Sequence, residues 1–173
     1  MMITSRALPL LSAVCLLTAT PVAWAQEATS KPILEHPGVF SLGPYYGLDL
    51  ADKGDQYSHF AGVNLSFDYQ LTNWVSLGLE QAGFYHFGTD DEGFGGRSAI
   101  GADFTFGTLS FLPYIGGNFG YLYGNGINDE FFAGPEVGLA VGPLTAKVAY
   151  DIPFNEGLQD GVVSATLGVG IRF

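Results

Sequence analysis

Hydrophobic and polar residues alternate with a period of two over most of the chain after residue 37. The pattern is clearest between Val163 and Phe173, where every second residue is apolar and the residues between them are small or polar. Successive side chains of a β-strand point to opposite faces of a sheet, so this segment predicts a strand with one apolar and one polar face. Its length matches that of a tilted strand crossing a bilayer, about 9–11 residues.

Earlier segments show the same alternation, and they lie at residues 39–50, 61–71, 74–87, 98–106, 109–123, 131–141 and 144–152. The segment 74–87 is the least regular, because Gln81 interrupts its apolar face. We expect a β-bulge at Gln81, which leaves the facing of Phe84 and His86 open. Prolines inside predicted strands predict further bulges, or strands that end at other residues than the alternation suggests: Pro44, Pro113 and Pro135.

The predicted connections alternate between short and long. Tight connections lie near residues 72–73, 107–108 and 142–143, whereas longer polar ones lie at 51–58, 88–97, 124–130 and 153–160. Short turns at one end and longer loops at the other are typical of membrane barrels. Together with the even number of segments, they predict an all-β fold, an eight-stranded antiparallel up-and-down transmembrane β-barrel. Closure of such a sheet leaves no exposed edge.

The two faces of the predicted strands differ in side-chain size. One face carries mainly Leu, Ile, Val, Phe and Tyr, and the other carries mainly Gly, Ser, Asn and Asp. A soluble barrel of the lipocalin kind would keep its bulky apolar side chains inside. Eight strands enclose only a narrow space, so the small, polar face suits the lumen and the bulky face suits lipid. The reverse arrangement would cost about 2–4 kcal/mol for each Lys or Arg near the bilayer midplane.

Aromatic residues near the strand ends predict two belts at the membrane interfaces. At the ends with short turns these are Tyr69, Trp74, Phe104, Phe106, Phe111 and Phe173. At the ends with long loops they are Tyr57, Phe60, Tyr85, Phe87, Tyr121, Tyr123 and Phe131.

The first 25 residues have the pattern of a cleaved secretory signal peptide. Arg6 precedes an apolar stretch, and Ala23-Trp24-Ala25 is a small-x-small cleavage site. The alternative, an uncleaved membrane helix, is disfavoured because the apolar core is short for crossing a bilayer. We therefore expect a signal peptide at residues 1–25, an irregular periplasmic lead-in at 26–37 and the barrel at 38–173.

Composition narrows the classes of partner. The chain has a net charge of −11, and loss of the signal peptide would leave five basic residues against 17 acidic ones, a net charge of −12. Such a surface repels nucleic acid phosphates. The single cysteine lies in the signal segment, so the mature chain has no disulfide framework. We expect no cofactor and no metal, because no glycine-rich loop opens a helix and three scattered histidines do not make a zinc site.

The signal ending in Ala-Trp-Ala, the alternating segments and the terminal Gly-Val-Gly-Ile-Arg-Phe resemble small outer-membrane barrels of the OmpA/OmpX/opacity-protein type. The stretch PYIGGNFGY at residues 113–121 also resembles the fifth-strand region of such proteins. The resemblance covers residues 38–173. It implies a monomer in the bacterial outer membrane, in contact with lipid and lipopolysaccharide. It also implies that the barrel-assembly machinery reads a C-terminal signal, here Val169, Ile171 and Phe173.

Charged residues on the polar face predict a charge network inside the lumen. We expect Lys147 to pair with Glu136 across the turn near residues 142–143. A network of this kind predicts either a plug of ion pairs and water or a narrow cation-favouring pore gated by such pairs. The predicted members are Asp49, Asp68, Glu80, Asp103, Glu136, Lys147, Asp151 and Arg172.

The long loops are acidic, and two interpretations remain for them. They form either a solvated acidic rim or a surface at which divalent cations bridge carboxylates to lipopolysaccharide phosphates. The acidic residues concerned are Asp52, Asp55, Asp90, Asp91, Glu92, Asp129, Glu130, Glu156 and Asp160.

An enzyme of the lipid-A-modifying kind is the third functional class. Its chemistry needs a Ser, a His and an orienting acid near the outer rim. In this sequence Ser58, His59 and His86 lie near the rim, with Asp90 and Asp91 close in sequence. Adjacent strand residues point to opposite faces, so Ser58 is poorly placed to serve His59. We therefore expect no catalysis. The favoured function is a structural or surface-interaction role, with the narrow pore as the alternative.

Overall fold

The computed structural model describes residues 37–50, 58–88, 92–108, 110–125, 129–154 and 161–173. The expected signal peptide and residues 26–36 of the lead-in lie outside the described residues. None of the described residues belongs to a helix long and apolar enough to cross a membrane.

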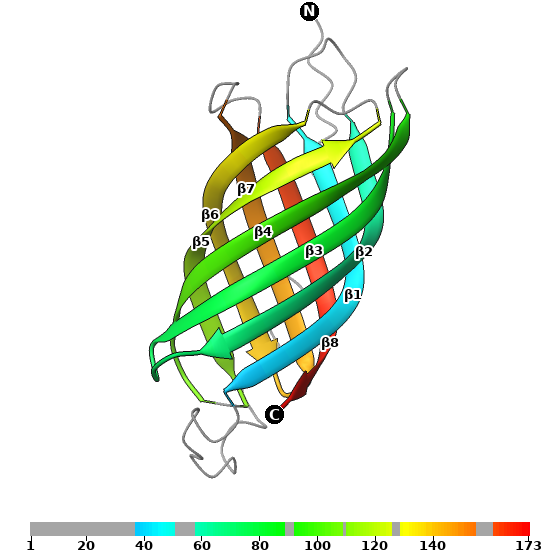
Figure 1. The fold of residues 1–173 in the computed structure, drawn as a ribbon. Coiled ribbons are helices and arrows are strands. Elements are labelled where there is room, and N and C mark those ends of the chain that lie inside the picture. The colour runs from blue at the N-terminus through cyan, green and yellow to red at the C-terminus, as the bar shows by residue number, and fades with distance from the viewer. Residues whose placement is uncertain (1–36, 51–57, 89–91, 109, 126–128, 155–160) are drawn as a thin grey trace, which may run out of the picture. The chain divides into compact units, whose positions relative to one another are not determined.

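Eight antiparallel strands form a closed barrel in which each strand pairs with its neighbours in the sequence and β1 pairs with β8 (Figure 1). The predicted fold class is therefore confirmed. The strands are β1 (Gly38–Asp49), β2 (His59–Gln70), β3 (Val75–Phe87), β4 (Gly93–Thr105), β5 (Leu112–Gly124), β6 (Glu130–Val141), β7 (Leu144–Pro153) and β8 (Val162–Arg172).

The connections differ between the two ends of the barrel. At what we term the short-turn end, the strands are joined at residues 71–74, 106–111 and 142–143, and Gly142 adopts a positive φ of 56° in the tightest of these turns. The strand termini Gly38 and Phe173 also meet at this end through two backbone hydrogen bonds of 3.0 Å. The opposite, long-loop end holds the connections at 50–58, 88–92, 125–129 and 154–161.

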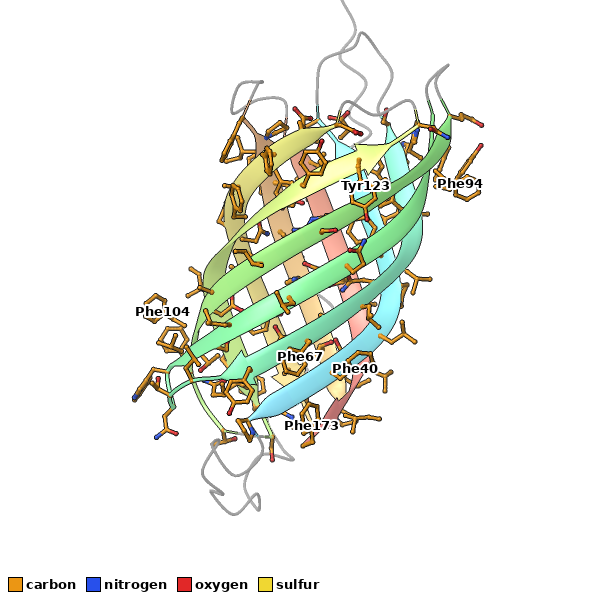
Figure 2. All side chains as sticks on the ribbon, in the orientation of Figure 1. Phe40, Phe67, Phe94, Phe104, Tyr123 and Phe173 are labelled. Carbon is orange, nitrogen blue, oxygen red and sulfur yellow. The ribbon has the colours of Figure 1, made fainter. Side chains whose placement is uncertain are left out.

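The predicted facing of the strands is confirmed by exposure. Outward residues such as Leu79, Ile100 and Val169 are 56–62% exposed, although they are large and apolar. Figure 2 shows aromatic side chains projecting outward near both ends, including Phe104 and Phe173 at one end and Phe94 at the other. The exposed apolar side chains form a band around the whole barrel. Such a surface is unfavourable in water and favourable in lipid, so the exterior suits a membrane.

The expected bulge at Gln81 is wrong. The pairing of β3 with β2 and with β4 runs through Gln81 without an extra residue, opposite Leu65 and Ser98. Gln81 therefore lies on the exposed outer face, and the alternation continues so that Phe84 and His86 point inward.

The strand prolines also produce no bulge. Pairing of β1 with β8 stops at Leu42–Val169 and resumes in the same register at Tyr45–Thr166, skipping Pro44. Pairing of β6 with β7 likewise skips Gly134 and Pro135 and resumes in register. Proline lacks the N–H that a ladder needs, so each Gly-Pro pair removes hydrogen bonds to one neighbour without changing the register. The third proline, Pro113, lies at the start of β5, which begins later than predicted.

Candidate functional site

The centre of the lumen is organised by Arg97, although the sequence pattern assigned this residue to a loop. Residues 93–97 instead extend β4, and the Arg97 side chain points inward with 0% of its surface exposed. Its Nε and Nη2 donate to the two carboxylate oxygens of Asp151 at 2.6 and 3.0 Å, and its Nη1 donates to Glu80 Oε2 at 2.5 Å. A bidentate guanidinium–carboxylate pair of this kind is both strong and geometrically specific.

Lys147 extends this arrangement toward the short-turn end. Its Nζ donates to Glu80 Oε2 at 2.7 Å and lies 3.2 Å from Glu136 Oε2, so the predicted pairing of Lys147 with Glu136 is present. Asn118 Nδ2 donates to the same Glu136 oxygen at 3.3 Å. Four strands thus contribute to one chain of ion pairs across the lumen, which we call the lumen network: Glu80, Arg97, Glu136, Lys147 and Asp151.

The other predicted lumen charges take no part in these ion pairs, although the Asp103 carboxyl lies within hydrogen-bonding reach of Glu136. Asp68 accepts a hydrogen bond of 3.2 Å from the Ser66 hydroxyl. Asp103 Oδ1 and Arg172 Nε are buried without a hydrogen-bond partner among the described residues. Asp49 lies at the long-loop end of β1, opposite Val162. The structure brings four members of the predicted set into the network.

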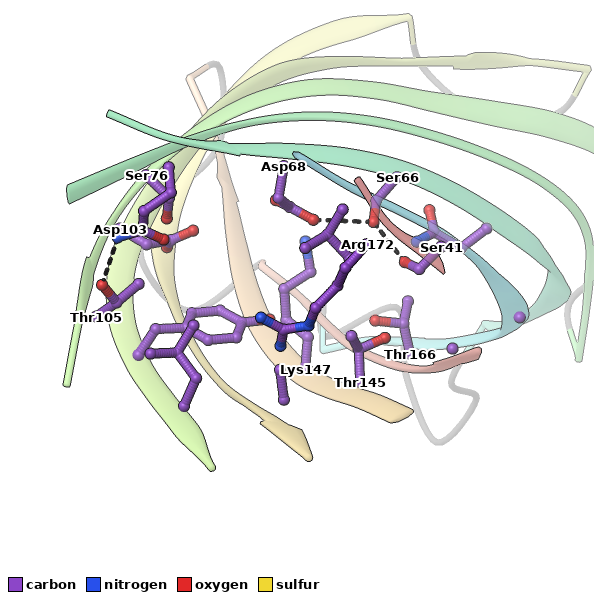
Figure 3. Close-up of a pocket in the computed structure, with 18 of the residues that line it drawn as sticks. Ser41, Ser66, Asp68, Ser76, Asp103, Thr105, Thr145, Lys147, Thr166 and Arg172 are labelled. Carbon is purple, nitrogen blue, oxygen red and sulfur yellow. Dashed lines mark hydrogen bonds between the residues drawn. The ribbon is translucent and has the colours of Figure 1, made fainter. Parts of the chain in front are cut away.

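A cavity of about 70 Å³, lined by both polar and apolar side chains, occupies the short-turn half of the lumen (Figure 3). We call it the lumen cavity. Since a single water needs about 10–15 Å³ of such space, it has room for several waters. Carboxylate, amide and hydroxyl groups line it together with two cations: Ser41, Asn64, Ser66, Asp68, Asp103, Thr105, Tyr114, Thr145, Lys147, Thr166 and Arg172.

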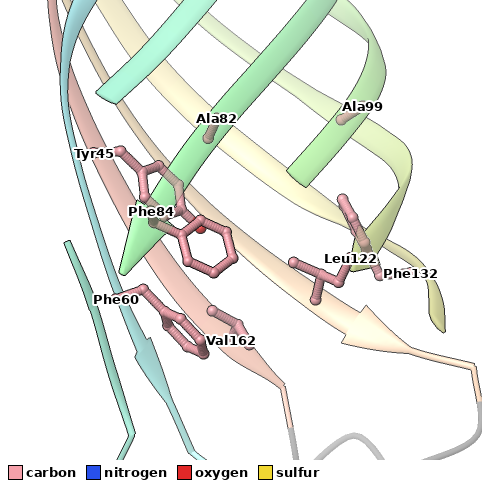
Figure 4. Close-up of a cluster of buried hydrophobic side chains, with 8 residues drawn as sticks. All are labelled: Tyr45, Phe60, Ala82, Phe84, Ala99, Leu122, Phe132 and Val162. Atoms are coloured by element: carbon pink, nitrogen blue, oxygen red, sulfur yellow. The ribbon is translucent and has the colours of Figure 1, made fainter. Parts of the chain in front are cut away.

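A cluster of buried apolar side chains lies inside the barrel, around the level of Arg97 and toward the long-loop end (Figure 4). We call it the apolar plug, and its members are Tyr45, Phe60, Ala82, Phe84, Ala99, Leu122, Phe132 and Val162. The ring of Phe84 stacks on Tyr45 at 5.6 Å and meets Phe60 edge-on at 5.0 Å, between centroids. Phe60 is therefore a lumen residue, and its assignment to the outer aromatic belt was wrong.

Arg97 joins the plug to the network. Its guanidinium carbon lies 4.7 Å from the centroid of the Phe132 ring, and Phe132 is itself 0% exposed. A guanidinium over an aromatic face is attracted by the ring quadrupole, most strongly where water is excluded. The packed rings and the ion pairs are therefore in direct contact inside the lumen at Arg97.

The two candidate catalytic histidines point to opposite faces of the barrel wall. His59 faces outward, where its Nδ1 lies 2.7 Å from the Tyr46 hydroxyl, whereas His86 faces inward and donates from Nε2 to the Asn125 carbonyl at 2.6 Å. A Ser–His–acid arrangement needs all three groups within hydrogen-bond reach, and strand geometry separates these two histidines. Asp90 and Asp91 lie outside the described residues. No group of three or more His, Cys, Asp or Glu side chains in the described part of the chain could hold a metal ion.

The acidic loops are described only in part. Glu92 accepts a hydrogen bond of 3.0 Å from the Tyr85 hydroxyl, and Asp129 accepts one of 3.1 Å from the Gly124 amide. Glu130 was expected on the rim, but it begins β6 and faces inward with 9% exposure. The remaining acidic loop residues lie outside the described residues: Asp52, Asp55, Asp90, Asp91, Glu156 and Asp160.

A second small polar cluster, besides the Tyr46–His59 pair, lies on the mainly apolar outer face. Gln81 donates to the Tyr123 hydroxyl at 2.7 Å and to the Ala82 carbonyl at 3.2 Å, and it accepts from the Ser98 hydroxyl at 2.6 Å. A polar side chain in hydrocarbon is costly unless it is hydrogen-bonded. The neighbouring strands β4 and β5 therefore supply the partners that make Gln81 tolerable at this position.

Comparison with known proteins finds similar folds but no related sequence. No protein family and no curated protein matches the sequence. The attachment invasion locus protein Ail of Yersinia pestis shares 18% identity with a TM-score of 0.53, over 80% of this chain and 99% of Ail. Neisserial surface protein A shares 14% identity with a TM-score of 0.55, over 78% and 95%. The N-terminal barrel of Pseudomonas aeruginosa OprF shares 22% with a TM-score of 0.51, over 80% and 98%.

These structures belong to small barrels of bacterial outer membranes, so the expected resemblance is confirmed for the fold. The chain has the fold of an eight-stranded outer-membrane β-barrel. At sequence identities this low, a ligand or partner of one protein cannot be inferred for the other.

Proposed function

We propose that the protein is an integral outer-membrane barrel with a closed lumen, which serves as a structural scaffold that presents its long loops at the cell surface. The observation that carries this proposal is the filling of the lumen by packed side chains and by ion pairs. The apolar plug packs inside the barrel around Arg97 and toward the long-loop end, and the lumen network crosses the barrel in contact with it. An ion that crossed would have to displace packed rings and also separate buried ion pairs, and the second step alone leaves uncompensated charge.

The apolar exterior supports insertion in a membrane. The aromatic residues at both ends of the barrel support a position in which each end lies at a membrane interface. In barrels of this kind the short turns face the periplasm and the longer loops face outward. The contacts then expected are lipid along the strands, and lipopolysaccharide around the long-loop end. The C-terminal residues Val169, Ile171 and Phe173 are 62%, 71% and 59% exposed, as a segment that an assembly machinery reads would need to be.

Conductance in planar bilayers tests the closed lumen against the narrow pore. The folded protein should give no current above that of the bilayer alone. A variant that removes both barriers, Arg97→Ala with Phe84→Ala, should give discrete openings, while the exterior pair Leu79→Ala with Ile100→Ala serves as the matched control. Regular openings of the unaltered protein would overturn the closed lumen and establish the pore.

A further inference from the structure

The lumen carries acidic side chains that its own cations do not neutralise. The four ion pairs of the described residues use the carboxylates of Glu80, Glu136 and Asp151. Neither Asp68 nor Asp103 takes part in them, and the Asp103 carboxyl lies within hydrogen-bonding reach of the Glu136 carboxyl, an acid of like charge. A carboxylate removed from bulk water is costly unless a cation or several hydrogen-bond donors accompany it.

A second, independent feature points into the same space. Asn64 and Asp103 are each 6% exposed, both line the lumen cavity, and the Oδ1 atom of each is buried without a hydrogen-bond donor on the protein. Asn118 Oδ1, beside Glu136 in an adjoining small pocket, is in the same situation. All three atoms are hydrogen-bond acceptors, so each lacks either a donor or a cation. Because buried polar groups almost always have a partner, we expect water or an ion inside the cavity to provide it.

The polar part of the cavity wall is rich in oxygen atoms, whereas Val39, Leu112, Ala140 and Leu167 contribute apolar surface. Hydroxyl groups of Ser66, Thr145 and Thr166 line it beside the amide and carboxylate oxygens. The basic side chains that line the cavity do not neutralise Asp68 and Asp103. Lys147 is paired with Glu80 and Glu136, and Arg172 makes no ion pair with either acid. Hard cations prefer oxygen ligands of this kind. Divalent ions prefer several carboxylates at once, and no such group of three exists among the described residues.

Glycine makes room for this arrangement. A Cβ atom on Gly78 would lie 2.7 Å from Asp68 Oδ1, and one on Gly116 would collide with Asp103 Oδ1. Each acid therefore lies flat over a glycine of the neighbouring strand, which keeps the centre of the cavity open.

We propose that the lumen cavity binds a partly hydrated monovalent cation, Na⁺ or K⁺, through Asp103 and Asp68 together with the Asn64 amide oxygen and wall hydroxyls. The site is distinct from a conduction path, because the apolar plug closes the lumen beyond it. The bound cation supplies the positive charge that the two acids lack and the partner that the buried oxygens lack.

Sodium-23 relaxation of the folded full chain in detergent micelles tests the site. Na⁺ should show saturable line broadening that K⁺ displaces and that N-methylglucamine, which is too large for the cavity, does not. Asp103→Asn should weaken binding about tenfold or more. Asn64→Leu should weaken it as well, although the net charge is unchanged. The exposed acid Glu92, altered to Gln, is the matched control and should leave binding intact.

A second measurement covers the case in which Asp103→Asn fails to fold. The urea midpoint of the unaltered protein should rise with NaCl or KCl beyond its rise in N-methylglucamine chloride of equal ionic strength, since a ligand of the folded state stabilises it. Equal effects of all three salts, or broadening that Asn64→Leu leaves unchanged, would overturn the proposal in favour of surface screening with water alone in the cavity. Displacement of Na⁺ by equimolar or lower Ca²⁺ would overturn the monovalent class.

Discussion

Arg97 and Asp151 are 54 residues apart in the sequence, and they face each other across the barrel through two hydrogen bonds of 2.6 and 3.0 Å. Asp151 is 0% exposed, as is Arg97, so neither charge can be solvated if its partner is lost. The pair links β4 with β7, which are not neighbours in the sheet. It therefore joins two walls of the barrel through its interior, in addition to the strand ladders that set the barrel's size.

Removal of Arg97 should destabilise the barrel strongly. Arg97→Ala leaves Glu80 and Asp151 buried without their main partner, and breaking a buried pair in this way costs about 3–5 kcal/mol. Urea unfolding in lipid vesicles, followed by the fluorescence of Trp74, measures the change. Arg97→Lys should lose less, because it keeps the charge and loses the bidentate geometry. A change in the free energy of unfolding below about 0.5 kcal/mol, the size expected for a surface substitution, would contradict the central role of Arg97.

The polar cluster on the outer face predicts a difference between two similar substitutions on β3. Gln81→Leu exchanges a hydrogen-bonded amide for an apolar side chain and should change the free energy of unfolding by less than about 1.5 kcal/mol. Leu79→Gln, at the preceding outward position, introduces an amide into lipid without an established partner and should cost about 1–3 kcal/mol. The same vesicle unfolding assay compares them. Equal losses would show that Gln81 gains nothing from Ser98 and Tyr123.

Glycine-to-alanine substitutions should have different effects on stability at Gly134, where another strand's backbone is close, and at Gly83, where the surroundings are open. Alanine at Gly134 would place its Cβ against the Tyr150 carbonyl, a backbone atom that cannot move aside. We expect a loss of about 1–3 kcal/mol, typical of overpacking. Gly83→Ala meets nothing within 4 Å and should be neutral or stabilising by up to about 1 kcal/mol. A destabilising Gly83→Ala would contradict the open outer face described for that position.

The C-terminal aromatic predicts a difference between cellular assembly and refolding. Phe173→Ser should reduce the amount of folded barrel in the outer membrane, because the assembly signal loses its aromatic residue. Refolding of the purified chain in detergent should change little, since the bonds joining Phe173 to Gly38 are made by backbone atoms. Phe104→Ser, another exposed aromatic at the same end, is the control. Equal losses in cells for both variants would argue against a specific signal.

The strand pattern could be predicted because period-two alternation depends only on neighbouring residues. The missing part of the site has a physical reason as well. The sequence before Arg97 is Gly93-Phe94-Gly95-Gly96, in which three glycines give no alternation to detect, so the start of β4 resembled a loop. With that segment misassigned, the cation at the centre of the lumen network could not be placed on any face.

The apolar plug was missed for a different reason. An aromatic residue on a strand can face lipid or fill the lumen. The alternation of the sequence decides between these only when it is known which alternate positions of the strand point inward. Gln81 obscured the phase of β3, so the inward facing of Phe84 could not be decided. The partners that satisfy Gln81, Ser98 and Tyr123, come from other strands and carry no signal in the sequence near it.

The two Gly-Pro interruptions have a joint consequence for the order in which the barrel comes apart. One removes hydrogen bonds between β6 and β7 and the other removes them between β8 and β1, so the β7–β8 hairpin has a weakened ladder along both of its outer edges. Cooperative units of a protein open where the fewest bonds join them to the rest. The hairpin of residues 144–172 is thus the natural detachable unit of this barrel. Because its terminal residues carry the proposed assembly signal, the segment that is recognised first would also be the one that closes the sheet last.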